Sequence, residues 1–248
     1  DLIIAGSNFI FSHINENYSE YLNFNKKFLV IFRGINTEYF NPNKIHQSDE
    51  KKLISQWNTN KERPLILLPG RLTSWKGQEM FIEALNLVNQ ELKQEVFNAV
   101  ILGSAQGRDV YKKKLLRLVE QYRLNKQIKF VDHCKHMPLA YKISNLVVSS
   151  SIEPEAFGKV SVEAQSMEKL IIASNIGGSN ETIINDKTGL LFESGKPKSL
   201  SQKIIEALKL DDTTLKIMGN EGRKNVIKKF NIEKMCFSTY SEYKKLIN

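Results

Sequence analysis

The fold class follows from one stretch of the chain, Leu146-Val-Val-Ser-Ser-Ser-Ile-Glu-Pro-Glu-Ala-Phe-Gly-Lys-Val-Ser-Val-Glu163. Residues 146–151 form a compact run that is typical of a buried parallel strand. Pro154 cannot lie inside a strand and favours a loop or the start of a helix. From about Ala156 the apolar residues recur at helical spacing, which predicts a helix with one apolar side formed by Phe157, Val160, Val162, Ala164 and Met167.

Two carboxylates, Glu155 and Glu163, lie on either side of this predicted helix start. An α-helix rises about 1.5 Å and turns about 100° per residue, so we expect them about 12 Å apart along the axis and within about 80° in azimuth. This separation is too large for a shared proton-transfer pair. It suits two hydroxyl-bearing rings joined by a diphosphate, which the free N–H groups of the helix start would face. The alternative is structural, because the helix dipole stabilises carboxylates near an N-terminus.

A second segment, PLILLPGRLTSWKG at residues 64–77, places two cations directly after an apolar strand. We expect the strand to end at Gly70 and a helix to follow the loop, with a buried side formed by Met80, Phe81, Ala84, Leu85 and Val88. Arg71 and Lys76 would then lie at the carboxyl end of a parallel strand, where open α/β sheets bind ligands. Both side chains suit phosphate oxygens. A solvated basic turn is the alternative, and the paired carboxylates favour the binding site.

The rest of the chain predicts an α/β fold with a doubly wound, Rossmann-like parallel sheet. Apolar strands alternate with amphipathic helices from about residue 28 to residue 208, which indicates a sheet covered on both faces. The predicted strands lie near 28–32, 64–69, 97–102, 127–131, 145–150, 170–173 and 190–192. Residues 109–122 and 199–208 are predicted helices, and the polar residues 41–50 are predicted to be a surface loop.

Four motifs occur in the order and at the intervals of a known family: Gly70-Arg71-Leu72 with Lys76-Gly77, Glu155-x7-Glu163, Gly177-Gly178-Ser-Asn-Glu181 and Thr188-Gly189-Leu-Leu191. Together they resemble the carboxyl-terminal half of a family 4 glycosyltransferase with the GT-B fold, of the bacterial lipopolysaccharide and polysaccharide type. Gly34-Ile35-Asn36-Thr-Glu-Tyr-Phe40 resembles the segment that usually opens this half, with Asn36 where the family more often has Asp. The resemblance covers nearly the whole chain.

The resemblance implies a site for a nucleotide-sugar donor such as a UDP- or GDP-sugar, with no separate cofactor. Arg71 and Lys76 would hold the diphosphate and neutralise the charge that grows on the leaving group, and Glu155 would contact the transferred sugar. These three form the expected catalytic set. Glu163 would accept hydrogen bonds from the ribose hydroxyls. The other expected donor-binding positions act through close approach and main-chain N–H groups, and they are Gly70, Phe157, Gly158, Lys159, Val160 and Gly178.

The reaction that the resemblance implies is transfer of a hexosyl group to a hydroxyl acceptor, a glycan or a lipid-linked molecule, in cell-surface polysaccharide or lipopolysaccharide synthesis. Retention of anomeric configuration and independence of metal ions are expected. The family mechanism is commonly viewed as same-face attack in which the leaving phosphate helps to take the acceptor proton, so no protein nucleophile is assigned. The alternative is a non-catalytic nucleotide-sugar-binding module or an inactive fragment.

Three parts are expected along the chain. Residues 1–32 resemble the last strand–helix unit and linker of an amino-terminal GT-B domain, with a helix capped by Ser7 or Asn8. Residues 33–230 would form the nucleotide-sugar-binding domain, and residues 231–248 a helix that crosses back to the first domain. We therefore expect a donor-binding half whose partner is the missing N-terminal domain, and an isolated chain that is inactive if it lacks the acceptor site.

Composition limits the other partners. The 248 residues carry a formal net charge of +9, with 41% hydrophobic and 25% charged residues, as in ordinary globular proteins. The lysines are spread along predicted helix surfaces without a nucleic-acid-reading motif, so we expect no nucleic-acid binding and a modest attraction to anionic membranes. No segment approaches the roughly 20 apolar residues of a membrane span. The expected location is the cytoplasm, with peripheral contact at the inner membrane.

Two remaining motifs are weak. Asp132-His133-Cys134-Lys135-His136 contains four possible metal ligands, but adjacent ligands rarely surround one ion. We expect no metal there, and the segment is either an ordinary loop or, as the resemblance implies, a loop against the nucleobase. Gly103-Ser-Ala-Gln-Gly107 lacks the spacing of a dinucleotide-binding fingerprint.

Overall fold

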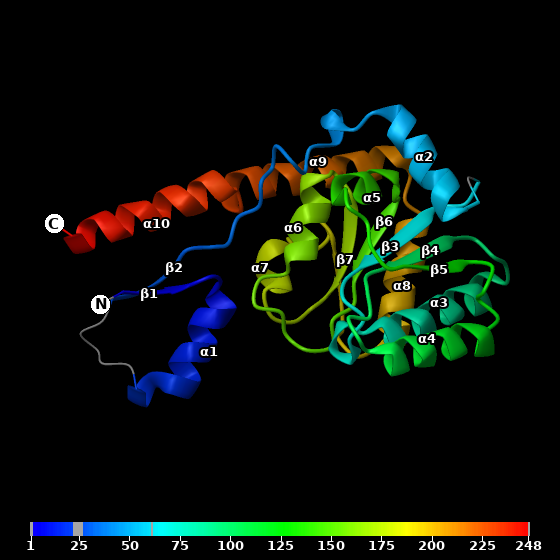
Figure 1. Cartoon of the computed structure of the whole chain (residues 1–248), viewed down its shortest axis with the longest axis horizontal. Helices are drawn as coiled ribbons and strands as arrows, with labels where there is room; N and C mark the ends of the chain where they lie inside the picture. The colour runs from blue at the N-terminus through cyan, green and yellow to red at the C-terminus, as the bar shows by residue number, and fades with distance from the viewer. Residues whose placement is uncertain (1, 22–26, 61, 248) are drawn as a thin grey trace.

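Six parallel strands form the central sheet in the order β5-β4-β3-β6-β7-β8 (Figure 1). The computed structural model describes residues 2–21, 27–60 and 62–247. The six strands are β3 (Leu65–Pro69), β4 (Asn98–Leu102), β5 (Ile128–Val131), β6 (Leu146–Ser149), β7 (Leu170–Ser174) and β8 (Leu190–Phe192). All five pairings are parallel, which confirms the doubly wound α/β sheet.

The strand order reverses between β3 and β6. From β3 the chain continues outward to β4 and β5, whereas from β6 it continues in the other direction to β7 and β8. In open α/β sheets the crevice beyond the carboxyl ends of two such strands is where ligands bind. The loops that follow β3 and β6 therefore border the expected binding crevice. The first loop carries Arg71 and Lys76, and the second carries Glu155.

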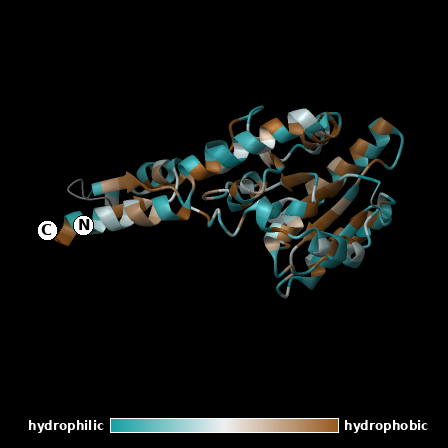
Figure 2. Cartoon of the chain, turned by 90° about the horizontal axis from the view of Figure 1, so that it is seen from above, coloured by the Kyte–Doolittle hydropathy of each residue, from teal (hydrophilic) through white to brown (hydrophobic). Residues whose placement is uncertain are grey.

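Helices cover both faces of the sheet because every strand is buried on both sides. Alternate residues of β3 enter different apolar clusters, with Ile66 and Leu68 in one and Leu65 and Leu67 in the other. The first cluster is closed by α3 (Gln78–Leu92), α4 (Asp109–Gln121) and α8 (Pro197–Leu208), and the second by α2 (Gln47–Trp57), α5 (Met137–Ile143), α6 (Lys159–Ser166) and α9 (Asp212–Lys229). The apolar strands lie inside and hydrophilic residues cover the helix surfaces (Figure 2).

A smaller part lies beside this domain (Figure 1). It contains β1 (Leu2–Ala5), α1 (Asn8–Tyr18), the short helix η1 (Ser19–Tyr21), β2 (Lys27–Val30) and the long terminal helix α10 (Ile232–Ile247). Strand β2 pairs in parallel with β1 and not with the central sheet, so the expectation that the strand near 28–32 belongs to the main sheet is wrong. An apolar run indicates that a strand forms, but it carries no information about which strand it pairs with.

The predicted surface loop at 41–50 is also wrong. This segment contains the short helix η2 (Pro42–Lys44) and the first turn of α2. Leu53 and Trp57, four positions apart, bury one side of α2, while Asp49 and Glu50 lie half-buried in its first turn, where the helix dipole favours acidic groups. The sequence did not predict this helix because its first residues are polar and its buried residues come only in the later turns.

The loops that follow β3 and β6 are in direct contact. The first contains the short helix η3 (Ser74–Lys76). Ser150 donates its hydroxyl hydrogen to the main-chain oxygens of Lys76 and Gly77 over 2.9 and 3.2 Å, and the Ile152 N–H donates to the Trp75 carbonyl over 2.8 Å. Gly77 has a φ of +69°, and a Cβ at this position would lie 1.9 Å from the Ser150 carbonyl oxygen. Only glycine fits this contact without movement of the main chain.

We expect Gly77→Ala to destabilise the protein by about 3–5 kcal/mol, because it adds a steric clash with main chain to a left-handed conformation. Gly107→Ala is the matched control, since Gly107 has a φ of +83° but a Cβ there would have nothing within 4 Å. The control is expected to lose only about 1–2 kcal/mol. Urea denaturation measures both, and equal losses in the two variants would contradict the close contact.

Candidate functional site

Lys76 and Glu155 form a largely buried ion pair across the crevice between β3 and β6. Their Nζ and Oε1 atoms are 2.7 Å apart, with only 14% and 13% of the two side chains exposed. Ser151 donates its hydroxyl hydrogen to the same Glu155 oxygen over 2.5 Å, and the Lys76 ammonium lies 4.5 Å from the centre of the Trp75 ring. One predicted cation and one predicted carboxylate are therefore in direct contact, each with a further partner from its own loop.

The predicted helix starts at Lys159 and not near Ala156, so Glu155 lies in the preceding loop, four residues before the helix. Helix α6 begins at Lys159, because Gly158 has a left-handed φ of +80° that does not continue a helix. The estimate of about 12 Å along one helix axis therefore does not apply to Glu155 and Glu163. The prediction of a helix with one apolar side is also wrong. Helix α6 is buried on nearly all sides and includes buried polar residues at 161, 163, 165 and 166.

Gly178, in the loop that follows the neighbouring strand β7, contacts the Glu155 loop through its main chain. Its N–H donates to the Glu155 carbonyl over 2.7 Å, and a Cβ on Gly178 would lie 2.5 Å from the Phe157 Cα. Phe157 points its ring into the core, where it packs 5.7 Å from Phe230, so it reaches the site only through its main chain. Val160 is half-buried against the same apolar cluster.

Glu163 is the second buried carboxylate, with 7% of the residue exposed. Its Oε2 accepts a hydrogen bond from the Tyr141 hydroxyl over 2.7 Å, and the Lys159 ammonium lies 3.4 Å from Oε1. Burial raises the pKa of Glu163, and the Tyr141 hydrogen bond and the Lys159 charge act in the opposite direction. Glu163 lies in the second turn of α6, beyond the free N–H groups of its first turn.

Arg71 is the second residue after β3 and is exposed. Its carbonyl oxygen accepts a hydrogen bond from the Gln78 amide over 2.8 Å, but no ion pair joins its guanidinium to any carboxylate in the described ranges. Gly70 lies beside Lys76, since a Cβ there would be 3.7 Å from the Lys76 Cδ. Gly103, at the end of β4, packs against the Gly70 carbonyl, so this glycine has a packing role beside the cationic loop.

A cavity of about 340 Å³ borders the Glu155 loop. It is lined by Arg33, Gly34, Ile35, Glu155, Ala156, Phe157, Gly158 and Lys159. Four expected site residues thus line one cavity, while Arg33 and Gly34 were not predicted to face the site. Gly34 belongs to the segment at 34–40 that resembles the opening of this half, but no motif marks Arg33, which reaches the site from another part of the chain.

Glu181 lies on the short helix α7 (Ser179–Thr182) and contacts a different helix. Its carboxylate accepts hydrogen bonds from the Asn8 and Phe9 N–H groups over 2.8 and 2.6 Å, and from the Asn8 side-chain amide over 2.8 Å. Glu181 therefore binds the N-terminus of α1, which Ser7 also caps by accepting from the Ile10 N–H.

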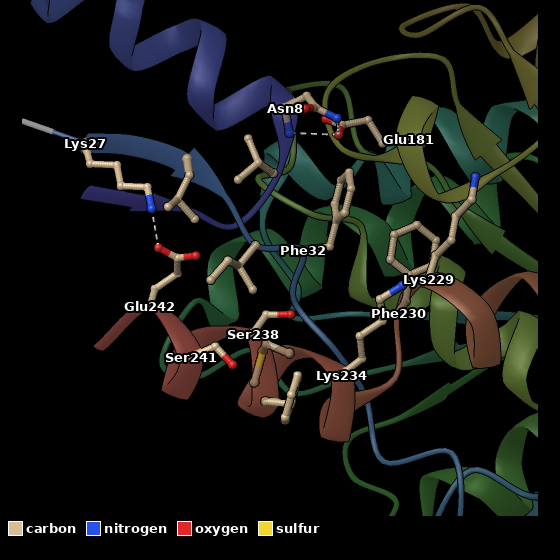
Figure 3. A pocket seen from close by; sticks show the side chains of 15 residues that line it. Asn8, Lys27, Phe32, Glu181, Lys229, Phe230, Lys234, Ser238, Ser241 and Glu242 are labelled. Carbon is tan, nitrogen blue, oxygen red and sulfur yellow. Dashed lines mark hydrogen bonds and ion pairs between the residues drawn. The ribbon is translucent and has the colours of Figure 1, made fainter. Parts of the chain in front are cut away.

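A larger cavity of about 820 Å³ lies between β2 and α10 (Figure 3). Asn8 and Glu181 lie at one end of it and the Lys27–Glu242 ion pair, 2.6 Å long, at the other. None of the residues predicted to bind the donor lines this cavity. We therefore assign the candidate site to the sheet edge and not to the larger cavity.

The segment at 132–136 gives no support to a metal site. Asp132 pairs with Lys112 over 2.6 Å, and the Cys134 thiol donates to the His136 carbonyl over 3.4 Å. Burial raises the pKa of the Cys134 thiol. In the part of the chain that the structure describes, no three His, Cys, Asp or Glu side chains are grouped to hold a metal ion. The His136 ring lies 5.8 Å from the Tyr39 ring, edge to face.

The profile of a protein family described as glycosyl transferases group 1 matches residues 49–225, more than half of the chain. A glycosyltransferase structure from Rickettsia africae ESF-5 is 32% identical, with a TM-score of 0.94, and the match covers 100% of this chain and 64% of that one. An uncharacterized glycosyltransferase from Methanocaldococcus jannaschii is 29% identical over 99% of this chain and 58% of its own length.

HepE from Anabaena, solved in complex with UDP-glucose, is 23% identical with a TM-score of 0.87 over 98% of this chain and 64% of that chain. At this identity the likeness concerns the fold alone. The chain spans 58% to 64% of the length of these three relatives.

A double-mutant cycle can measure the contact between Lys76 and Glu155. We expect Lys76→Met or Glu155→Gln alone to cost about 3 kcal/mol, because each leaves a buried partner unpaired. The double variant should lose less than the sum of the two, by about 1–3 kcal/mol. Chemical denaturation measures the four proteins. The exposed Lys44–Glu38 pair, 2.6 Å long, is the control and should show much weaker coupling, whereas equal coupling would contradict a buried pair.

Proposed function

This chain belongs to the glycosyl transferases group 1 family, and from this premise we propose that it binds the nucleotide-sugar donor of a glycosyl transfer reaction. The proposed site is the crevice between β3 and β6, at the carboxyl edge of the sheet. The observation that carries the proposal is the Lys76–Glu155 ion pair, which joins the loops of these two strands where their order reverses.

The donor's diphosphate would be held by cations and main-chain N–H groups. Lys76 has three donors on its ammonium, so it can bind a phosphate oxygen while it stays paired with Glu155. Arg71 offers a guanidinium that no described carboxylate occupies. The N–H groups of Lys159 and Val160, at the start of α6, make no hydrogen bond to another described residue. This supports their assignment to a phosphate or sugar oxygen.

The donor's hydroxyl groups would be bound by the two carboxylates. We assign Glu163 to the ribose, because its side chain is buried on α6, the helix that begins after the Glu155 loop, and is held by a second residue. Glu155 is assigned to the transferred sugar, and Gly70, Gly158 and Gly178 to close main-chain approach. Phe157 would contribute through its main chain, since its ring packs in the core.

The finer assignment is a family 4 enzyme of the bacterial lipopolysaccharide or polysaccharide type, with GT-B architecture. We propose that it transfers a hexosyl group to a hydroxyl of a glycan or lipid-linked acceptor, with retention of configuration and without a metal ion. Residues 33–230 would be the donor domain. Residues 1–32 and 231–248 would face an N-terminal GT-B domain that carries the acceptor site.

The charge of the chain supports contact with an anionic membrane surface. The formal net charge is +9. None of the helices in the described ranges has the length and hydropathy of a membrane-spanning segment. We propose peripheral contact at the cytoplasmic face of the inner membrane, where cations next to the surface are attracted to anionic lipids.

The second candidate function is a nucleotide-sugar-binding module without activity of its own. The observation that favours it is that the proposed donor-binding residues all lie in one domain, while no described residue is assigned to an acceptor. Incubation of the 248-residue chain with a UDP-sugar distinguishes the two functions. Donor hydrolysis or transfer supports the enzyme, and binding without turnover supports the module.

We expect Arg71→Ala to weaken binding of the donor about 10- to 100-fold, the value of a charge-assisted hydrogen bond. The loss should shrink at high salt, because the contact is electrostatic. Glu163→Ala should weaken binding as well. A thermal-shift screen of UDP-, GDP- and ADP-sugars selects the donor, and calorimetry measures the affinities.

Arg117→Ala is the matched control, since it removes the same charge from an exposed position on α4. Its donor affinity should equal that of the wild type. Wild-type affinity in both Arg71→Ala and Glu163→Ala would overturn the site assignment.

A further inference from the structure

Tyr141 is a fully buried tyrosine whose hydroxyl has a single polar contact among the residues that the structure describes. The residue lies on α5 with 0% of its surface exposed, and its hydroxyl donates to Glu163 Oε2 over 2.7 Å. A buried tyrosine hydroxyl needs a partner, because an unpaired polar group costs free energy away from water. Here the partner is the carboxylate of a residue in the proposed site.

The surroundings of Tyr141 fix its ring in place. Its ring packs edge to face against Phe40 at 6.1 Å between centroids. The Phe40 N–H donates to the Asn36 carbonyl over 3.0 Å, and the Phe40 carbonyl accepts from the Ser166 hydroxyl over 2.7 Å. The segment at 36–40 thus packs on both α5 and α6, the two helices that carry Tyr141 and Glu163.

Glu163 has no other buried partner among the residues described. Lys159 is 3.4 Å from its Oε1, but 74% of the Lys159 side chain is exposed, so this pair is screened by solvent. On α9, which packs against α6, Arg223 faces the Ser166 carbonyl and lies 3.7 Å from Glu168, not toward Glu163. Tyr141 and Lys159 are therefore the titratable groups that face this carboxylate.

We propose that Tyr141 is a positioning residue that holds the Glu163 carboxylate in one orientation for the ribose hydroxyls of the donor. This inference rests on the proposed function, in which Glu163 accepts hydrogen bonds from the ribose. The contact occupies Oε2 with a donor from the protein interior and leaves Oε1 on the side of Lys159. A carboxylate oxygen can accept from more than one donor, so the Tyr141 bond orients Glu163 without blocking it.

The Tyr141 bond also affects the protonation of Glu163. Burial raises the pKa of Glu163, and the Tyr141 hydrogen bond is the first of the contacts that lower it. Tyr141 itself stays protonated near neutral pH, because burial and the Glu163 charge raise its pKa well above 10. Loss of the hydroxyl would therefore raise the pKa of Glu163 further. Since a protonated carboxyl is a poorer acceptor, donor affinity should then begin to fall at a higher pH as the solution is acidified.

The experiment measures UDP-glucose binding by calorimetry between about pH 5.5 and pH 8.5. UDP-glucose is the probe because its diphosphate, esterified at both ends, does not titrate in this range. Tyr141→Phe is expected to weaken binding about three- to tenfold at pH 7.5, the value of one hydrogen bond. The loss should grow as the pH falls. Glu163→Gln should bind weakly at every pH, and Tyr141→Phe in the Glu163→Gln background should have no further effect on the pH profile.

Two further variants make the result specific. Tyr111→Phe is the matched control, because it removes a tyrosine hydroxyl that donates to Gln78 Oε1 over 3.2 Å, away from Glu163. It should keep the wild-type pH profile. Phe40→Leu keeps the Tyr141 hydroxyl but removes the ring packed against it. It should move the fall in UDP-glucose affinity to a higher pH, as Tyr141→Phe does, but by a smaller amount. If Tyr141→Phe does not fold, this variant tests the positioning role of Tyr141.

The outcomes separate the two proposals. If the wild type binds no nucleotide sugar, or Glu163→Gln binds as tightly as the wild type, the proposed site is wrong. If Glu163→Gln behaves as expected but Tyr141→Phe keeps the wild-type affinity and pH profile, the positioning role of Tyr141 is wrong and the site stands. A uniform loss in Tyr141→Phe with an unchanged pH profile would indicate a purely structural role and would also overturn the inference.

Discussion

The contact between Gly77 and Ser150 is the constraint on which the candidate site depends. Parallel strands β3 and β6 are neighbours, but the chain leaves them in opposite directions, so their loops would separate unless something holds them together. A left-handed glycine allows main chain to touch main chain at this point, and Ser150 bonds to both Lys76 and Gly77. The contact brings a lysine from one loop against a carboxylate from the other. The ion pair is thus a consequence of main-chain packing between the two loops, and the same packing explains why so little of the two side chains is exposed.

The two carboxylates that follow β6, Glu155 and Glu163, are held by different chemistry. Glu155 is paired with a cation and a serine hydroxyl, whereas Glu163 is paired with a neutral tyrosine hydroxyl and an exposed lysine. A cation compensates a buried negative charge directly, but a hydroxyl does so only in part, which explains why burial still raises the pKa of Glu163. In the proposed function these environments allow one carboxylate to act beside the diphosphate and the other to bind a ribose away from it.

The loops of the site also contact the smaller part of the molecule. Glu181 accepts from the N-terminus of α1, and Ser7 donates its hydroxyl hydrogen to the Ala156 carbonyl over 2.5 Å, within the same loop as Glu155. At the other end, Ile35 pairs with Asn231 at the start of α10. The position of α1 is therefore coupled to the segments that carry Glu155 and Gly178.

The sequence by itself determined the strands of the central sheet, most of the helices and the residues at the carboxyl ends of β3 and β6, because these depend on local apolar periodicity and on proline and glycine. It also allowed Lys76 and Glu155 to be assigned to one edge, since parallel strands end on the same side. Only the tertiary structure decided that β2 pairs with β1, that α6 begins at Lys159, and that Tyr141 and Glu181 contact residues 22 and 173 positions away. The physical reason is that such contacts follow from how elements pack across the fold, and no local pattern records them.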